Sequence, residues 1–203
     1  MKNCLDKRCL MKCQIYQSSL NEWKPTLFHL NSKGAYVYEL AFSDTEKLPF
    51  EVIEVVMKQS QSFPLYVYLE TSESFVELFD DLRLQQYDIT YYKKTRAKDR
   101  WKIMFKINDS QQFQGMSPLV ELLSNMEDLV FWSTNKQQFL TRNRWQGSGV
   151  QVNLEESETL YCLPNAGTAL AIFSKNTSFS TTEKVRALLP PRKDYLTKKL
   201  YNY

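Results

Sequence analysis

The sequence predicts a mixed α/β fold, in which one compact domain contains a mixed parallel and antiparallel sheet with flanking helices. Two similar segments, residues 36–40 and 66–70, are each followed by a helical pattern, which indicates two βα units with parallel strands. Strand pairs joined by short turns near both ends of the chain indicate antiparallel strands as well. A mixed sheet with helices on one or both faces satisfies both observations.

Composition and length set the domain organisation. The chain has 203 residues, of which 43% are hydrophobic, 24% charged and 14% aromatic. A chain of this length and hydrophobic content buries a core without disulfides or metals. We expect one domain over residues 21–190. A polar segment over 1–20, either a short helix or disordered, precedes it, and a basic aromatic tail over 191–203 follows it.

The first half of the domain alternates strands and helices. Residues 26–30 and 35–42 are predicted strands around a turn, in which Gly34 suits a positive φ. A buried helix is expected over 49–60, although its β-branched residues also allow a strand. A strand over 65–70 follows.

The next helix has the strongest local pattern. Ser74 and Glu77 have the spacing of a capping box. An apolar face follows at helical spacing, made of Phe75, Leu78, Phe79 and Leu82.

The second half continues with strands over 87–93 and 100–107, a helix that starts with Ser117 as N-cap and Pro118, and a strand over 129–133. A hairpin is expected from strands 159–163 and 168–174. Ser180 and Glu183 predict a last helix over 181–189, which ends at Pro190 and Pro191.

The side chains needed for catalysis are sparse. The one histidine, His29, lies in an expected strand and is read as an ordinary strand or core residue. The sequence contains no nucleotide-binding glycine loop, zinc-protease motif or serine-hydrolase elbow. We therefore expect no catalytic residues, no cofactor and no enzymatic activity.

Cysteine spacing leaves one alternative open. Cys4, Cys9 and Cys13 crowd the N-terminus, whereas Cys162 is distant. A metal site would need Cys162 or His29 as a fourth ligand, and unligated thiols are the simpler interpretation. The absence of a disulfide pattern, a secretory signal and a membrane span favours the cytoplasm.

Two charged surfaces are candidates for binding. The acidic face of the helix that follows Ser74 would receive a basic protein partner, unless it is only a solvated face; its residues are Glu73, Glu77, Asp80 and Asp81. The hairpin over 87–107 would present a basic outer face to nucleic acid, or only protect a sheet edge; its residues are Tyr92, Lys94, Arg100, Lys102 and Lys106.

The expected function is non-catalytic binding of another macromolecule, most simply another protein. Regulators, inhibitors and immunity or antitoxin-type proteins share this compositional profile. The alternative is a nucleic-acid-binding regulator that uses the hairpin 87–107 together with the basic tail. An enzyme whose acidic site is assembled from distant segments is a third hypothesis. The identity of the partner and the oligomeric state do not follow from the sequence.

Overall fold

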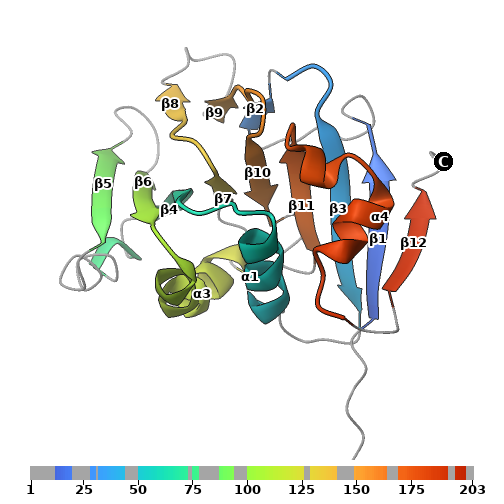
Figure 1. Cartoon of the computed structure of the whole chain (residues 1–203). Coiled ribbons are helices and arrows are strands. Elements are labelled where there is room, and N and C mark those ends of the chain that lie inside the picture. The colour runs from blue at the N-terminus through green and yellow to red at the C-terminus, as the bar shows by residue number, and fades with distance from the viewer. Residues whose placement is uncertain are drawn as a thin grey trace, which may run out of the picture.

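The computed structural model describes residues 12–19, 28–30, 32–43, 50–72, 75–77, 87–93, 100–125, 129–140, 149–163, 169–191 and 195–199. These residues form a large sheet, a small sheet and three α-helices. Figure 1 shows the large sheet running across the whole width of the molecule.

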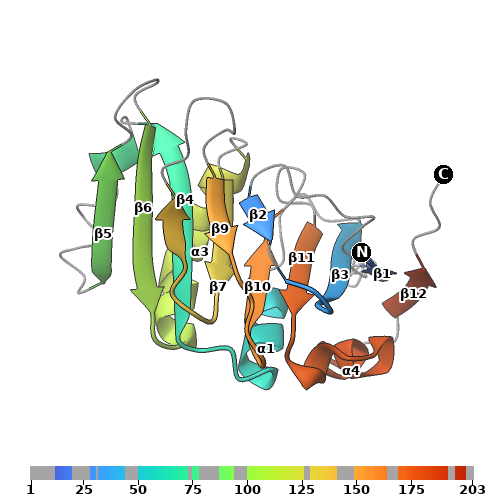
Figure 2. The same ribbon diagram turned by 90° about the horizontal axis from the view of Figure 1, so that it is seen from above.

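Nine strands make up the large sheet. They are β1 (Lys12–Ser18), β3 (Tyr36–Ser43), β4 (Leu65–Ser72), β5 (Asp88–Lys93), β6 (Arg100–Ile107), β7 (Leu129–Ser133), β10 (Thr159–Cys162), β11 (Ala169–Ser174) and β12 (Tyr195–Lys199). Their order is β12-β1-β3-β11-β10-β7-β4-β6-β5. Strand β5 therefore forms one edge and β12 the other, at opposite ends of the molecule (Figures 1 and 2).

The prediction of a mixed α/β fold is wrong, because the structure is mostly sheet. In the spatial order of the large sheet, the eight strands that run from β1 at one side to β5 at the edge are all paired antiparallel. Only the edge strand β12 joins this sheet in parallel, against β1. The two similar segments lie in β3 and β4, which are not neighbours. Strand β3 pairs antiparallel with β1 and β11, and β4 pairs antiparallel with β7 and β6.

One face of the large sheet is covered by helices α1 (Phe50–Gln59), α3 (Ser110–Asn125) and α4 (Thr182–Ala187). Ile53 and Val56 of α1, Phe113 of α3 and Val185 of α4 are all buried in this core. The α1 and α3 helices are also joined by a hydrogen bond of 2.7 Å from the Gln114 amide to Glu54.

The opposite face carries a second core beneath a small sheet. This sheet has the order β2-β9-β8, formed by β2 (Phe28–Leu30), β9 (Gly149–Val152) and β8 (Gln138–Leu140). Val152 packs with Phe131 and Phe173 of the large sheet in this core. Tyr68 stacks on Phe131 with ring centroids 4.9 Å apart, and its hydroxyl donates to the carbonyl of Gln137 over 2.9 Å.

Most of the predicted elements are confirmed as elements. The helix expected over 49–60 is α1, and the strands expected over 65–70, 87–93, 100–107 and 129–133 are β4, β5, β6 and β7. The predicted hairpin is formed by β10 and β11. Gly34 has φ of 75°, as its turn position requires.

Three boundaries differ from the prediction. Helix α3 begins at Ser110, not at Ser117, because the Asp109 carboxylate accepts from the Gln112 amide over 2.9 Å and caps it there. Helix α4 is capped by Thr181 one residue after the predicted Ser180. Of the helix expected after Ser74, residues 75–77 are described and form a helical turn.

Both ends of the described chain belong to the large sheet. Residues 12–18, expected in a short helix or disordered segment, form β1, because Cys13 and Ile15 alternate into the core and are fully buried. Residues 195–199 of the predicted tail form β12. Among the described helices, none is both long and apolar enough to cross a membrane.

Candidate protein-binding surface

Strand β12 presents an exposed apolar side chain at one edge of the large sheet. Leu196 is 51% exposed, and it is the one large hydrophobic side chain left exposed among those that the structure describes. It lies beside Gln14 of β1 in the parallel register.

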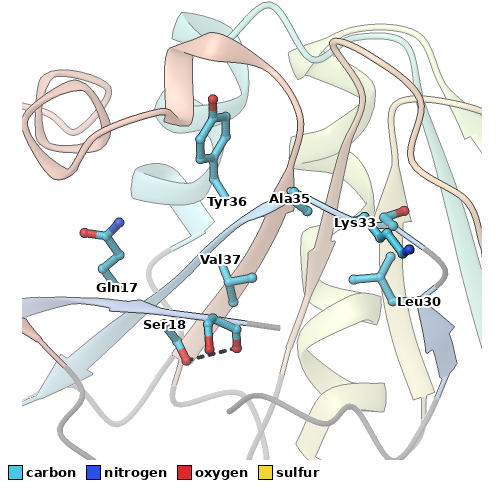
Figure 3. Close-up of a pocket in the computed structure, with 10 residues that line it drawn as sticks. Gln17, Ser18, Leu30, Lys33, Ala35, Tyr36 and Val37 are labelled. Carbon is cyan, nitrogen blue, oxygen red and sulfur yellow. Dashed lines mark hydrogen bonds between the residues drawn. The ribbon is translucent and has the colours of Figure 1, made fainter. Parts of the chain in front are cut away.

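An open cleft of about 800 Å³ lies at the end of the sheet where β1 finishes and β3 begins (Figure 3). Gln17 lines it, and the register places Gln17 beside Lys199 of β12. The cleft therefore starts about 10 Å from Leu196, since a strand rises roughly 3.3 Å per residue.

The cleft has an apolar part and a polar part. Leu30, Ala35 and Val37 pack on the core beneath the small sheet, and they form its apolar wall. Tyr36 packs instead on the helix-covered core, so the cleft spans both faces of the sheet end. Its polar groups come from Gln17, Ser18, Ser19, Ser32, Lys33 and the Tyr36 hydroxyl.

Hydrogen bonds hold several of these polar residues in place. Thr182 of α4 donates to the Gln17 side chain over 3.2 Å, which ties α4 to the end of β1. Ser32 accepts from the Leu154 amide over 2.7 Å. Ser18 donates to the Ser19 carbonyl over 3.4 Å, the dashed bond in Figure 3. The cleft is thus built from positioned side chains.

Exposed basic residues lie at this end of the sheet, together with the exposed Glu183 of α4. Lys33 on the cleft rim and Lys184 and Arg186 of α4 are all exposed. Strand β12 ends in Lys198 and Lys199, in register with Tyr16 and Gln17 of β1. The ligand that such a surface favours is one with acidic groups. We call Gln17, Ser18, Ser19, Lys33, Tyr36 and Leu196 the β12 surface.

The predicted basic hairpin forms the other edge of the sheet, as β5 and β6. Its register confirms that Lys102 and Lys106 share the face that the helices leave open, because they lie opposite Glu70 and Tyr66 of β4. Lys102 is not displayed, however: it is only 5% exposed, and the facing Glu70 is only 7% exposed. Buried opposite charges on facing positions offset each other.

The rest of the hairpin residues are placed only in part. Lys106 is half-buried, between Tyr66 of β4 and the exposed Asp88 of β5. The backbones of Tyr92 and Arg100 lie in β5 and β6. Lys94 lies outside the described residues.

The basic tail is not brought to the hairpin, and the predicted acidic face is described only at Glu77. Glu77 is exposed in its helical turn, whereas Glu73, Asp80 and Asp81 lie outside the described residues. The tail strand β12 is eight strand spacings from β5, or roughly 38 Å at about 4.8 Å each. One short nucleic-acid segment does not contact both edges at once.

The two described cysteines are buried on opposite faces. Cys13 belongs to the helix-covered core and Cys162 to the core beneath the small sheet. Burial raises the pKa of each thiol to about 12, so both are protonated at neutral pH. The sheet therefore separates Cys13 from Cys162, and the two do not share a metal ion. Cys4, Cys9 and the His29 side chain lie outside the described residues. Among the residues that the structure describes, no group of three side chains could hold a metal ion.

Comparison with protein-family models, with curated proteins and with solved structures finds no significant match to this chain. The residues of the β12 surface were not singled out in the sequence, because they come from three separate segments. The one available signal was the Tyr195–Lys199 pattern, in which Tyr, Leu and Thr are frequent in strands.

Proposed function

We propose that this protein acts by binding another protein through the β12 surface and catalyses no reaction of its own. The observation that carries the proposal is the exposed Leu196 on an edge strand beside a polar cleft. Apolar anchors surrounded by polar groups are the usual composition of protein interfaces. A regulator, inhibitor or immunity-type protein works through such a surface.

The surface also limits the chemistry of the partner. Leu196 needs an apolar side chain opposite it, and the cleft offers hydroxyl, amide and ammonium donors. Lys33, which is exposed on the cleft rim, favours a carboxylate. The fitting partner is a protein with an extended acidic segment that carries one apolar residue.

The nucleic-acid alternative has less support. It relied on the hairpin and the tail together, which lie at opposite edges of the sheet. It also relied on Lys102, which is buried opposite Glu70. A phosphate backbone needs displayed cations, because affinity comes from counterion release. As part of the same proposal we place the protein in the cytoplasm, where reduced thiols such as Cys13 and Cys162 are maintained.

The test is quantitative capture from cells that contain the protein naturally. Tagged wild-type chain, Leu196→Asp and Lys33→Glu are compared with the matched variant Lys136→Glu, which changes an exposed lysine outside the β12 surface. We expect one protein to be recovered with the wild type and with Lys136→Glu. Its recovery should fall about tenfold or more with Leu196→Asp and Lys33→Glu, since each adds an acid opposite an acidic segment.

Direct binding of the captured protein then decides the proposal. Titration of the purified pair should give an affinity that weakens with added salt. Equal recovery by all four baits would remove the β12 surface as the binding site. Turnover of a small molecule by the purified chain would instead favour an enzyme.

A further inference from the structure

Strand β5, at the edge opposite β12, is fixed to its neighbours by pairing and packing. All six of its residues pair with β6, which is the one strand that pairs with β5 in the described part of the chain. Ile89 is buried in the helix-covered core, and the hydroxyl of the preceding Tyr87 donates to the Gln112 carbonyl of α3 over 3.3 Å. A strand fixed in this way needs no ordering to receive another strand.

The two edges of the sheet differ in their protection. Natural edge strands are commonly guarded against pairing with other chains by lysine, proline or a bulge. Strand β12 carries two lysines, Lys198 and Lys199, among its five residues. Strand β5 is charged only at its ends, Asp88 and Lys93, and its middle is Ile-Thr-Tyr-Tyr, four residues of high strand propensity.

We propose that a second copy of this chain pairs through β5, which extends the antiparallel sheet across a two-fold axis. The charges favour this direction. Because β5 begins with an acid and ends with a base, antiparallel pairing brings each Asp88 end toward the Lys93 end of its mate. Parallel pairing would bring like charges together.

Symmetry fixes the possible registers. A two-fold axis perpendicular to the sheet keeps each residue on its own face, so one residue of β5 must lie opposite its own copy. With Thr90 at the axis, Ile89 faces Tyr91 and Asp88 faces Tyr92. With Tyr91 at the axis, Ile89 would face Lys93, and with Ile89 or Tyr92 at the axis only three residues pair within β5. Thr90 is therefore assigned to the axis.

This register forms favourable cross-strand pairs. Thr–Thr pairs and pairs of aromatic with β-branched residues stabilise antiparallel strands. Ile89 is buried in the helix-covered core and Tyr91 follows on the same side of β5, so this register places the Ile89–Tyr91 pairs on the face of that core. Thr90 lies opposite Met104 of β6, on the other face, and is half-buried.

The experiment uses charge exchange at the axis. Sedimentation of the full chain is followed from about 5 to about 500 µM, because one strand pair is a small interface and binds weakly. The wild type should be dimeric at the upper end. Thr90→Lys and Thr90→Glu, each alone, should associate at least about tenfold more weakly, since each places like charges opposite one another. An equimolar mixture should restore the dimer.

The same two changes at the exposed Thr177, which lies beside α4, are the matched control and should leave dimerisation unchanged. Circular dichroism verifies that each variant is folded. A wild type that stays monomeric over the whole range overturns the proposal without any variant. If neither Thr90 change weakens dimerisation, the interface lies elsewhere. If the equimolar mixture of the two variants stays monomeric, Thr90 does not lie at the axis.

Discussion

At the scale of single residues, three buried hydroxyls form a closed cluster behind α1. Tyr161 of β10 bonds to Ser62 over 2.6 Å and to Ser60 over 3.1 Å, and the two serines are 2.8 Å apart. Burial raises the pKa of Tyr161 to about 12, although the two serine hydrogen bonds act to lower it. The phenol is therefore protonated at neutral pH, and its role is to satisfy two buried serines.

Removal of the Tyr161 hydroxyl should cost stability. Tyr161→Phe keeps the ring but leaves Ser62 with Ser60 as its one remaining partner in the cluster, so we expect a loss of about 1 to 3 kcal/mol in the free energy of unfolding. Urea denaturation measures it. Tyr161→Phe combined with Ser62→Ala removes both partners and should cost less than the sum of the two single changes. Strict additivity would show that the hydroxyls do not interact.

Glu54 of α1 gives a pH-dependent contribution. Burial acts to raise the pKa of its carboxyl, but hydrogen bonds from Lys58 and Gln114 outweigh it, so the pKa lies below its ordinary value. A carboxyl whose pKa is lower in the folded state than in the unfolded state stabilises the protein at pH values above its unfolded-state pKa. This stabilisation is lost as the pH falls through the folded-state pKa. The loss should therefore begin below about pH 4.5.

Comparison of the wild type with Glu54→Gln checks this sign. The difference in unfolding free energy between the two proteins should be largest near pH 7 and should shrink as the pH falls toward 3. Glu51, an exposed acid on the same helix, provides the control Glu51→Gln. A wild-type advantage that grows on acidification would contradict the assignment.

At the scale of elements, α3 accommodates a proline in its interior. Pro118 has no backbone N–H to donate to the carbonyl of Gln114, four residues earlier. The Ser117 hydroxyl donates to that carbonyl over 2.9 Å instead. This replacement explains how the helix continues through a residue that the sequence pattern places at its start.

The Ser117 hydroxyl should matter only while Pro118 is present. Ser117→Ala should lower the unfolding free energy by about 1 kcal/mol, because the Gln114 carbonyl loses its partner. Pro118→Ala restores the ordinary N–H donor and should stabilise the protein by about 1 to 3 kcal/mol. In the Pro118→Ala background, Ser117→Ala should cost almost nothing. An equal cost in both backgrounds, measured by thermal unfolding, would falsify the compensation.

The sequence predicts where strands occur better than how they pair. Alternating and uninterrupted apolar runs locate β4, β5, β6, β7, β10 and β11. The runs in β4 and β11 are apolar on both sides, which is typical of parallel strands between two helix layers. Here the second layer is the small sheet, so the same pattern arises in antiparallel strands. Strand order depends on contacts between distant segments and leaves no local pattern.

For the candidate sites too, local patterns are predicted correctly, whereas features that depend on distant segments are not. Alternation correctly places Lys102 and Lys106 on one face of the hairpin. It does not predict the burial of Lys102, because burial depends on β4, which supplies Glu70 thirty-two residues earlier. The β12 surface was not predicted, because its residues come from segments far apart in the sequence that meet only in the folded sheet.

At the scale of the whole molecule, the large sheet separates two hydrophobic cores, one on each face. Cys13 and Ile15 belong to the helix-covered core, and Phe131 and Phe173 to the core beneath the small sheet. The two edge strands of this sheet differ in charge. Strand β5 is uncharged in its middle, whereas β12 ends in lysines and adds in parallel at the end of the antiparallel order.

Strand β12 therefore has a second role, as the cover of β1. Five residue pairs join β12 to β1, from Cys13 with Tyr195 to Gln17 with Lys199. A chain that ends at Pro191 lacks β12, and its β1 becomes an edge strand. The middle of β1 is Cys-Gln-Ile-Tyr-Gln, without charge or proline, so it is an unguarded template for pairing with other chains.

Truncation after Pro191 should consequently lower the unfolding free energy by about 1 to 4 kcal/mol and cause association that grows with concentration. Leu196→Thr keeps β12 and removes only its exposed apolar side chain, so it should leave stability and solution state unchanged. Denaturation curves and light scattering of both chains measure the two effects. If the truncated chain remains as stable and as dispersed as the full one, β12 does not protect β1. If Leu196→Thr aggregates like the truncation, Leu196 is a packing residue, and the β12 surface loses its apolar anchor.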